Sequence, residues 1–491
     1  SGVLSARGGR GQMAAGGGGG GRIAVDYDPA AQAAAALPQV KCTAAGGSIG
    51  WDYELSPNIS AGKPGTLWFP DHQFLLRPGA GDRFRCSGQW MVEPELTGFS
   101  HTGDFFMDDA GLVFHAPGFA FEVSGSLVAS GSSPAANFIS LTNGTLTCGG
   151  TFAATNMIVE MKNGTLSTGG DVILSGSRVY LRTDGAACPT FESGGGLTLA
   201  AATQFRIWSG ATNAVSPDFG AWVEATGAMT LTGNSWVHPY SDVINGGSAW
   251  FHVGSLTVGA GSGFNAAEKG YRGGDKVGHP YGWGPGGGWY RPNGTGGTLG
   301  GGGGGHGGDG GANDGVQGLA NGFAVAPFGP GSGGGRGDWD GSAGGGAIRI
   351  RSVGPVAMDG TFNADGAKGV PNWGGPGSGG AIWVICQGFS GGSTALMTAK
   401  GGDGVNGNYS GGGGGRIAVW HQIAEGRESV AAELMQGVAR HAVLSDSLDT
   451  YLGAVSVTNG HFTAAAVPPP QVGTVVFVEI PPPSGTMFIL R

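Results

Sequence analysis

Three short motifs in this 491-residue chain contain residue types that could hydrolyse a glycosidic bond. They are paired carboxylates, a histidine between glycines and a pair of arginines, found at Asp108 and Asp109, at His306, and at Arg349 and Arg351. Glycoside hydrolases need two carboxyl groups within about 10 Å, one to protonate the leaving oxygen and one to activate water or attack the sugar. The residue types alone therefore allow a carbohydrate-cleaving site.

The order of these motifs argues against catalysis. Polygalacturonase-like β-helix enzymes carry NTD, DD, GHG and RIK in that order, whereas here the Asp pair precedes an incomplete motif, Thr183 and Asp184, with Arg182 in place of the asparagine. The Asp pair also precedes the expected solenoid strands, His306 lies inside a glycine run, and Arg349 lies in a repeated strand. We therefore expect no catalytic residue and no cofactor. A β-helix polysaccharide-degrading enzyme stays as the least favoured alternative.

Composition limits the class of protein. Glycine makes up 107 of 491 residues without a collagen period, while 40% of the chain is hydrophobic and only 12% is charged. This balance favours a folded, weakly charged chain over a disordered one. A net charge of -9 with 25 Lys and Arg argues against nucleic acid and anionic membrane partners. No apolar window approaches the length that spans a membrane.

Short strand patterns recur through the middle of the chain. "NGTLTCGG" from Asn143 is followed 20 residues later by "NGTLSTGG" from Asn163, and the segments 195–200, 228–233 and 254–259 repeat an apolar-Thr-apolar pattern. Each piece alternates apolar and small polar residues between Gly or Asn turns, as half-buried strands do. This spacing, without any helical pattern, favours a parallel β-solenoid. A β-sandwich, with hairpins every 8 to 12 residues or so, stays as the alternative fold.

After residue 259, glycine runs alternate with single apolar strands. The strings "GGGAIRI", "SGGAIWV" and "GGGRIAV" place Ile348, Ile382 and Ile417 at intervals of 34 and 35 residues, and "GGGGGGRIAV" stands near the start at 16–25. We expect these strands to occupy equivalent positions in successive repeats and to serve assembly. Their apolar residues are Ile23, Val25, Ile348, Ile350, Ile382, Val384, Ile417 and Val419.

The glycine runs themselves suit a polyglycine II bundle. Such a segment has three residues per turn and no internal hydrogen bonds, so its backbone groups must pair with neighbouring segments. Only residues without a side chain allow the segments to approach so closely. A solvated flexible loop is the alternative, since glycine loses the most entropy on ordering. We favour the ordered bundle because every run leads directly into an apolar strand in similar register.

The strings around these runs resemble a known repeat. "LSARGG" or "MTAKGG" precedes the glycine run, and "GTLWF" at 65–69 or "GTVVF" at 473–477 follows it. The arrangement resembles repeats of very large secreted, glycine-rich surface proteins of microbes, and its theme is similar to the glycine-rich domain of anaplastic lymphoma kinase. The resemblance covers residues 1–70 and about 255–480. It implies an extracellular location, a structural, adhesive or assembly role, and no catalytic residues.

Cysteines and sequons bear on that location. The five cysteines form no CxxC pair and have no histidine at zinc spacing, so we expect no metal site. We favour a disulfide between Cys42 and Cys86, and expect Cys386 to be a buried free thiol. Cys148 and Cys188 could pair only if the chain between them loops out of regular rungs. Five N-x-S/T sequons are glycosylation candidates, at Asn58, Asn143, Asn163, Asn293 and Asn408.

The sequence thus predicts an all-β protein with a central parallel β-solenoid between glycine-rich modules that contain polyglycine II-like segments. The expected parts are a glycine-rich N-terminal module (1–120), the solenoid (121–260), a glycine-rich strand-repeat bundle (261–421) and a C-terminal β module with Pro-rich segments (422–491). The expected function is an extracellular structural subunit that associates with itself, head to tail, into a filament or surface appendage. A secreted adhesin that binds a glycan or receptor is the alternative.

Both ends of the sequence bear on this expectation. The first strand pattern, 2–9, lacks the repeat that should precede it, and the apolar residues 487–490 lack one that should follow. Open ends of a solenoid expose unpaired backbone groups and need a cap or a partner. We therefore expect the two ends to pair between copies of the chain.

Overall fold

The computed structural model confirms an all-β solenoid fold with glycine-rich modules. It describes residues 2–11, 16–35, 40–47, 62–71, 73–74, 83–84, 86–90, 97–108, 110–114, 116, 118–132, 137–185, 187–212, 218–290, 300–312, 315–370, 373–405, 410–423, 442–462 and 468–479. One short helix, α1 (Pro29–Ala33), occurs among them. The chain forms two compact units: unit 1 contains 1–184 and 189–206, and unit 2 contains 185–188 and 207–491. The four segments expected from the sequence stay a prediction.

Unit 1 contains short strands of two to five residues. They are β1 (Gly2–Ser5), β2 (Arg22–Ala24), β3 (Val40–Thr43), β4 (Thr66–Trp68), β5 (Arg83–Phe84), β6 (Ser87–Trp90), β7 (Gly98–His101), β8 (Phe105–Asp108), β9 (Gly111–Phe114), β10 (Ala120–Val123), β11 (Leu127–Ser130), β12 (Phe138–Thr142), β13 (Thr145–Cys148), β14 (Phe152–Thr155), β15 (Ile158–Lys162), β16 (Thr165–Thr168), β17 (Val172–Ser175), β18 (Arg178–Arg182), β19 (Thr190–Ser193) and β20 (Leu197–Ala200). The strand β21 (Gln204–Trp208) contains the boundary between the units.

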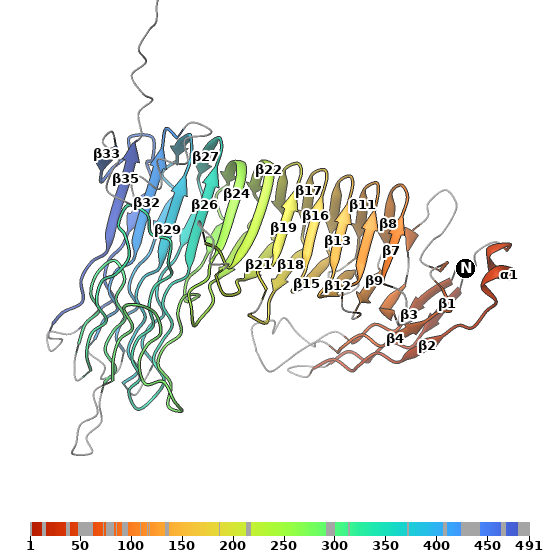
Figure 1. Ribbon diagram of the computed structural model, residues 1–491, viewed down its shortest axis with the longest axis horizontal. Helices are drawn as coiled ribbons and strands as arrows, with labels where there is room; N and C mark the ends of the chain where they lie inside the picture. The colour runs from red at the N-terminus through yellow and green to blue at the C-terminus, as the bar shows by residue number, and fades with distance from the viewer. Residues whose placement is uncertain are drawn as a thin grey trace, which may run out of the picture. The chain divides into compact units, whose positions relative to one another are not determined.

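The strands β6 to β20 wind as a parallel solenoid with three strands in each rung. One ladder contains β9, β12, β15 and β18, a second β7, β10, β13, β16 and β19, and a third β8, β11, β14, β17 and β20 (Figure 1). Leu146 lies opposite Leu166, so the 20-residue repeat read from the two "NGTL" strings is one rung. Neighbouring rungs are therefore about 4.8 Å apart along the solenoid.

Alternation of side chains builds the core of these rungs. In β15, for example, Val159 and Met161 are fully buried while Glu160 between them is partly exposed. Phenylalanines also fill this interior, where the Phe105 and Phe121 rings meet edge to face at 5.6 Å between centroids. Each such buried side chain stabilises the fold by about 1.5–3 kcal/mol relative to an exposed one.

Unit 2 begins with longer strands and continues with repeats interrupted by glycine. Its strands are β22 (Ala221–Leu231), β23 (Trp236–Tyr240), β24 (Ala249–Val258), β25 (Gly263–Asn265), β26 (Ala347–Ser352), β27 (Pro355–Met358), β28 (Thr361–Asn363), β29 (Ala381–Ile385), β30 (Gly388–Ser390), β31 (Leu396–Thr398), β32 (Arg416–His421), β33 (Val443–Ser445), β34 (Ala454–Ser456) and β35 (Thr474–Glu479). The ladders β24-β26-β29-β32-β35 and β23-β25-β28-β31-β34 are parallel throughout.

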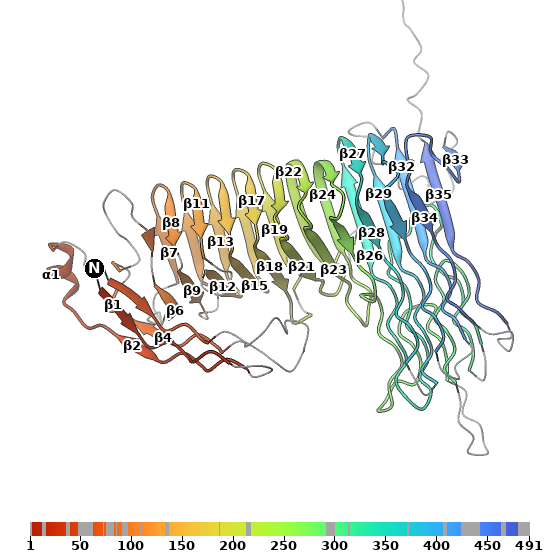
Figure 2. The same cartoon turned by 180° about the vertical axis from the view of Figure 1, so that it is seen from behind.

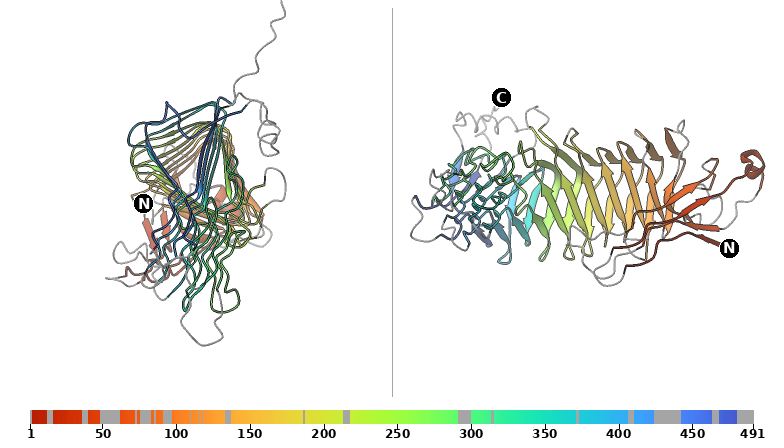
Figure 3. Two further views of the ribbon diagram at one scale, coloured as in Figure 1. Left: turned by 90° about the vertical axis from the view of Figure 1, so that its left-hand side faces the viewer. Right: turned by 90° about the horizontal axis from the view of Figure 1, so that it is seen from below.

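The glycine runs of unit 2 extend side by side from the ends of these strands (Figures 1 and 3). Their hydrogen bonds go to other runs, with a period of three residues. The N–H groups of Gly301 and Gly304 both donate to the segment 373–376, at 2.7 and 2.9 Å, whereas Gly302 and the residue three positions later donate to the segment 286–289. A threefold helix directs successive N–H groups to different neighbours in this way, so the runs are polyglycine II-like.

Close packing explains why these positions are glycine. A Cβ added at Gly345 would overlap the carbonyl oxygen of Ala364 and lie 2.6 Å from the backbone nitrogen of Gly380. The same holds along most of the run Gly301–Gly305 and of the run before β32. Because these neighbours are backbone atoms held by hydrogen bonds, the bundle has no room for a side chain at these positions. The runs are ordered parts of the fold and not solvated linkers.

Candidate functional site

The repeated strands of unit 2 form one continuous ladder. Ile348, Ile382 and Ile417 lie opposite one another in β26, β29 and β32, and Val475 of β35 continues the row. All but the last of these are fully buried. A second row, two residues further along each strand, consists of Ile350, Val384, Val419 and Phe477.

The first copy of the motif pairs in the same register within unit 1. Arg22 of β2 lies opposite Thr66 of β4, just as Arg416 of β32 lies opposite Thr474 of β35. Ile23 follows within β2, and the backbone N–H of the residue after β2, Val25, donates to β4 at 3.0 Å. The strings "RIAV" and "GT" are thus neighbouring strands of one two-rung unit that occurs twice.

The other strands and the glycine runs repeat this correspondence. The strand β1 pairs with β3 as β31 pairs with β34. Three backbone N–H to C=O bonds, all 2.9 Å or shorter, recur at equivalent positions in the two copies. In the N-terminal copy they are Gly18 to Gly9, Gly47 to Gly18 and Gly20 to Lys63. Their counterparts in the C-terminal copy are Gly412 to Gly402, Gly460 to Gly412 and Gly414 to Gln471. We call the described residues of 2–68 the head module, drawn at the β1 end in Figure 2, and those of 396–479 the tail rungs.

The two copies differ in what covers them. In the tail rungs, β31 and β32 have β28 and β29 on their other side, whereas no described strand lies on the other side of β1 and β2. Leu4 is consequently 46% exposed and its counterpart Met397 is 0% exposed. Ala24 is likewise exposed, and its counterpart Ala418 is buried. The head module therefore leaves open a face that the tail rungs bury.

The outer edge of the tail rungs is half covered. The strand β33 pairs antiparallel with β35 through Val443, Leu444 and Ser445, and reaches only Phe477 to Glu479 of that strand. All three residues of β33 are exposed. The stretch Thr474–Val476 of β35 has no described strand on this side. The apolar residues 487–490, expected to form an unpaired strand, lie outside the described residues.

The residues considered for catalysis lie in separate structural settings. Asp108 ends β8, opposite Ser130 of β11, so the expectation that it precedes the solenoid rungs was wrong: the pattern FFMD alternates as a rung strand. Asp109 lies outside the described residues. In unit 2, His306 is 2% exposed and burial lowers its pKa to about 4. The Arg349 guanidinium lies over the Trp250 ring at 4.2 Å, and burial lowers its pKa to about 10.

Two of the glycosylation candidates form a ladder of side chains at one solenoid turn. Asn143 and Asn163 both have positive φ, of 53° and 50°, which Asn tolerates better than most residues. The Asn163 amide donates to Asn143 Oδ1 at 3.0 Å and to Asp184 Oδ2 at 2.8 Å. A glycan on that nitrogen would replace one of its two hydrogens and so remove at least one of these hydrogen bonds, whereas Asn143 is exposed. The remaining candidates, Asn58, Asn293 and Asn408, lie outside the described residues.

All five cysteines are thiols in the structure, and the expected Cys42–Cys86 disulfide stays a prediction. The two residues nevertheless occupy neighbouring positions, because Thr43 of β3 lies opposite Ser87 of β6 and each cysteine immediately precedes one of these. Strands about 4.8 Å apart place Cα atoms within the range that a disulfide requires. Cys386 is a fully buried thiol, and burial raises its pKa.

Mild oxidation is therefore expected to link Cys42 to Cys86 within one chain. Peptide mapping without reduction should recover this linkage, and Cys42→Ser should abolish it. Cys386 is the internal control, because its buried protonated thiol should stay unmodified under the same conditions. Recovery of Cys42 and Cys86 as thiols, or of either one linked elsewhere, would contradict this pairing.

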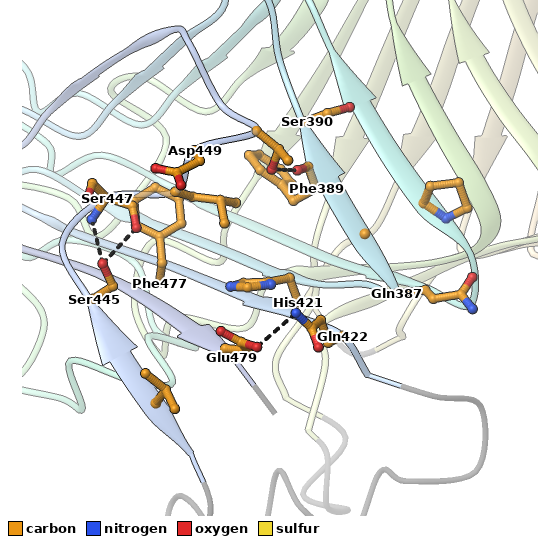
Figure 4. A pocket seen from close by; sticks show the side chains of 15 residues that line it. Gln387, Phe389, Ser390, His421, Gln422, Ser445, Ser447, Asp449, Phe477 and Glu479 are labelled. Carbon is orange, nitrogen blue, oxygen red and sulfur yellow. Dashed lines mark hydrogen bonds between the residues drawn. The ribbon is translucent and has the colours of Figure 1, made fainter. Parts of the chain in front are cut away.

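A pocket of about 600 Å³ lies beside β33 in unit 2 (Figure 4). Phe389 and Phe477 line it together with the polar side chains of His421, Asp449 and Glu479. Burial lowers the pKa of His421, and the Glu479 carboxylate acts against this shift. Aromatic faces beside carboxylates and an imidazole suit a small polar ligand such as a sugar. No pattern in the sequence indicated this pocket.

No family model, curated protein or solved structure gives a significant match to this chain. Among the described residues, no helix is long and apolar enough to cross a membrane. The same part of the chain contains no cluster of three or more His, Cys, Asp or Glu side chains arranged to hold a metal ion.

Proposed function

We propose that this protein is an extracellular structural subunit whose copies associate head to tail into a filament or surface appendage. One observation carries the proposal: the head module is a second copy of the tail rungs, in the same register, with the face open that the tail rungs bury. Open parallel edges bind further strands readily. An edge on the head and a different edge on the tail give a heterologous contact, which propagates into an open polymer.

The chemistry of the chain supports a scaffold. A glycine bundle with few side chains offers few groups for catalysis, and its cohesion comes mainly from backbone hydrogen bonds between runs. The solenoid adds rungs of one register, so its length grows without a change in cross-section. The resemblance of the glycine strings to secreted surface proteins supports the extracellular location.

The expected result is concentration-dependent polymerisation. Sedimentation of the purified chain should show a species that grows with concentration, and negative-stain microscopy should show unbranched fibres. Particles that stay monomeric at all concentrations would contradict the proposal.

The second candidate is an adhesin, favoured by the pocket that contains Phe389, Phe477 and Glu479. In that case the same micrographs should show dispersed particles, and these should retain a glycan ligand. Glu479→Gln should weaken retention, since the carboxylate would accept hydrogen bonds from sugar hydroxyls.

A further inference from the structure

We propose that the head module of one copy adds to the tail rungs of a second copy in the register that β32 and β35 already use inside the chain. This inference rests on the proposed function. It goes further by specifying which strands meet, which residues lie opposite each other, and how the contact is limited.

The head module has unused backbone groups on its open side. The N–H groups of Gly9 and Arg22 and the C=O of Arg7 have no partner among the described residues. The corresponding groups of the tail rungs are hydrogen-bonded to the preceding rung. The N–H groups of Gly402 and Arg416 donate to the carbonyls of Gly377 and Gly380, both at 2.9 Å, and the carbonyl of Lys400 accepts from the N–H of Gly366 at 2.8 Å. The head module thus carries the donors and acceptors of an internal rung.

The tail rungs have the complementary groups. The backbone N–H of Asn459 and the C=O groups of Pro470 and Gly473 have no partner in the part of the chain that the structure describes. In the inner rungs, the groups at these positions form hydrogen bonds with the following rung. Continuing the pattern gives hydrogen bonds between copies that include Asn459 N–H to Arg7, Gly9 N–H to Pro470, and Arg22 N–H to Gly473. Donors therefore meet acceptors at every position.

The apolar side chains follow the same register. The addition places Arg22 of one copy opposite Thr474 of the other, just as Arg416 lies opposite Thr474 within one chain. It likewise places Ser5 opposite Ser456, just as Thr398 lies opposite Ser456 within one chain. The Leu4 side chain, 46% exposed, then lies beside half-buried Val455. Burial of such side chains is the main favourable contribution to association.

The strand β33 limits the part of this contact that β2 makes with β35 to three residues. It occupies Phe477–Glu479 of the β35 edge and leaves Thr474–Val476 open, and β2 is itself three residues long. A longer open edge would accept strands in other registers, and natural sheets commonly cover or shorten their edges for this reason. We infer that β33 is a partial cap that selects the head module.

A matched pair of glycine substitutions tests the contact. No described atom lies within 4 Å of a Cβ built at Gly9, whereas one at Gly402 would overlap the carbonyl of Ala367. In the proposed junction the Gly9 position faces the carbonyl of Gly460 of the second copy. Gly9→Val should therefore leave the melting temperature of the monomer unchanged and raise the critical concentration for polymerisation at least about tenfold. Gly402→Val should destabilise the monomer itself.

Cross-linking between copies tests the register. Ser5→Cys in one copy and Ser456→Cys in another should form a disulfide in the polymer, because these positions lie opposite each other in the proposed junction. A head module that instead replaces β31 in the second copy would place Ser5 beside Asn363, since Thr398 holds that place within the chain. Ser5→Cys with Asn363→Cys is therefore the control pair, and its cross-link would overturn the addition.

The outcomes separate this inference from the proposed function. If Gly9→Val assembles like the wild type and the Ser5→Cys and Ser456→Cys pair forms no cross-link, the proposed register is wrong, although the chain still forms a polymer. A wild-type chain that forms no polymer would contradict both. Loss of fibres in Gly9→Val together with the Ser5–Ser456 cross-link would support the inference.

Discussion

Replacing Gly413 by Val is expected to destabilise unit 2 by at least about 3 kcal/mol. A Cβ at this position would overlap the carbonyl oxygen of Gly308. The run cannot shift away, because Gly413 donates to the carbonyl of Gly304 and accepts from the N–H of Gly379, both at 2.9 Å. Valine thus either breaks these bonds or forces the neighbouring runs apart. Chemical denaturation followed by circular dichroism measures the loss.

The control for this substitution is Gly329→Val. Gly329 also lies in the glycine-rich part of unit 2, yet nothing described lies within 4 Å of its Cβ position. The two variants make the same chemical change, so their difference isolates close packing from the backbone preference of valine. Gly329→Val should stay within about 0.5 kcal/mol of the wild type. An equally small effect at Gly413 would mean that the runs are solvated loops.

The rungs of the solenoid were predictable because their sequence is locally repetitive. The 20-residue shift between Asn143 and Asn163 is the pairing shift of β13 and β16, and the 34- and 35-residue intervals set Ile348, Ile382 and Ile417 opposite one another. Strand alternation and glycine spacing are local signals. They persist in the fold because each rung contacts mainly its neighbours.

The open face of the head module was only partly predictable. The strings "RIAV" and "GTLWF" were visible as repeats, but the pairing of Arg22 with Thr66 depends on contacts between segments 44 residues apart. Exposure of Leu4 against burial of Met397 depends on which rung lies next to each, and sequence similarity cannot report such a difference. Equal sequences here occupy unequal surroundings.

Neither the pocket nor the strand β33 beside it could be predicted from the sequence. The strand β33 is three exposed residues without apolar alternation, and it pairs with residues of β35 that lie 32 or more positions further along the chain. The lining residues Phe389, His421 and Glu479 come from three different strands of one sheet, β30, β32 and β35. Such convergence follows from rung stacking and is absent from any single stretch of sequence.

Acid is expected to destabilise unit 2 through His306. Burial lowers the pKa of this side chain to about 4 in the folded state, and the nearby Arg416 cation acts in the same direction. In the unfolded chain the pKa returns to about 6.5. Below about pH 6.5, His306 therefore binds a proton in the unfolded state but stays unprotonated in the folded state. The contribution of His306 to the free energy of unfolding is therefore fully present above about pH 6.5 and falls by about 3 kcal/mol in total as the pH falls to 4.

The substitution His306→Gln tests this expectation through a slope. The imidazole Nδ1 lies 3.1 Å from the carbonyls of both Gly379 and Gly380, and since a carbonyl can only accept, this nitrogen carries a hydrogen. Gln retains a donor and does not titrate, so the free energy of unfolding should vary less between pH 6.5 and 4 than in the wild type. His461→Gln, at an exposed position, should keep the wild-type slope. Equal slopes in all three proteins would show that His306 is not held neutral in the bundle, and the histidine between glycines would regain its place as a candidate acid or base.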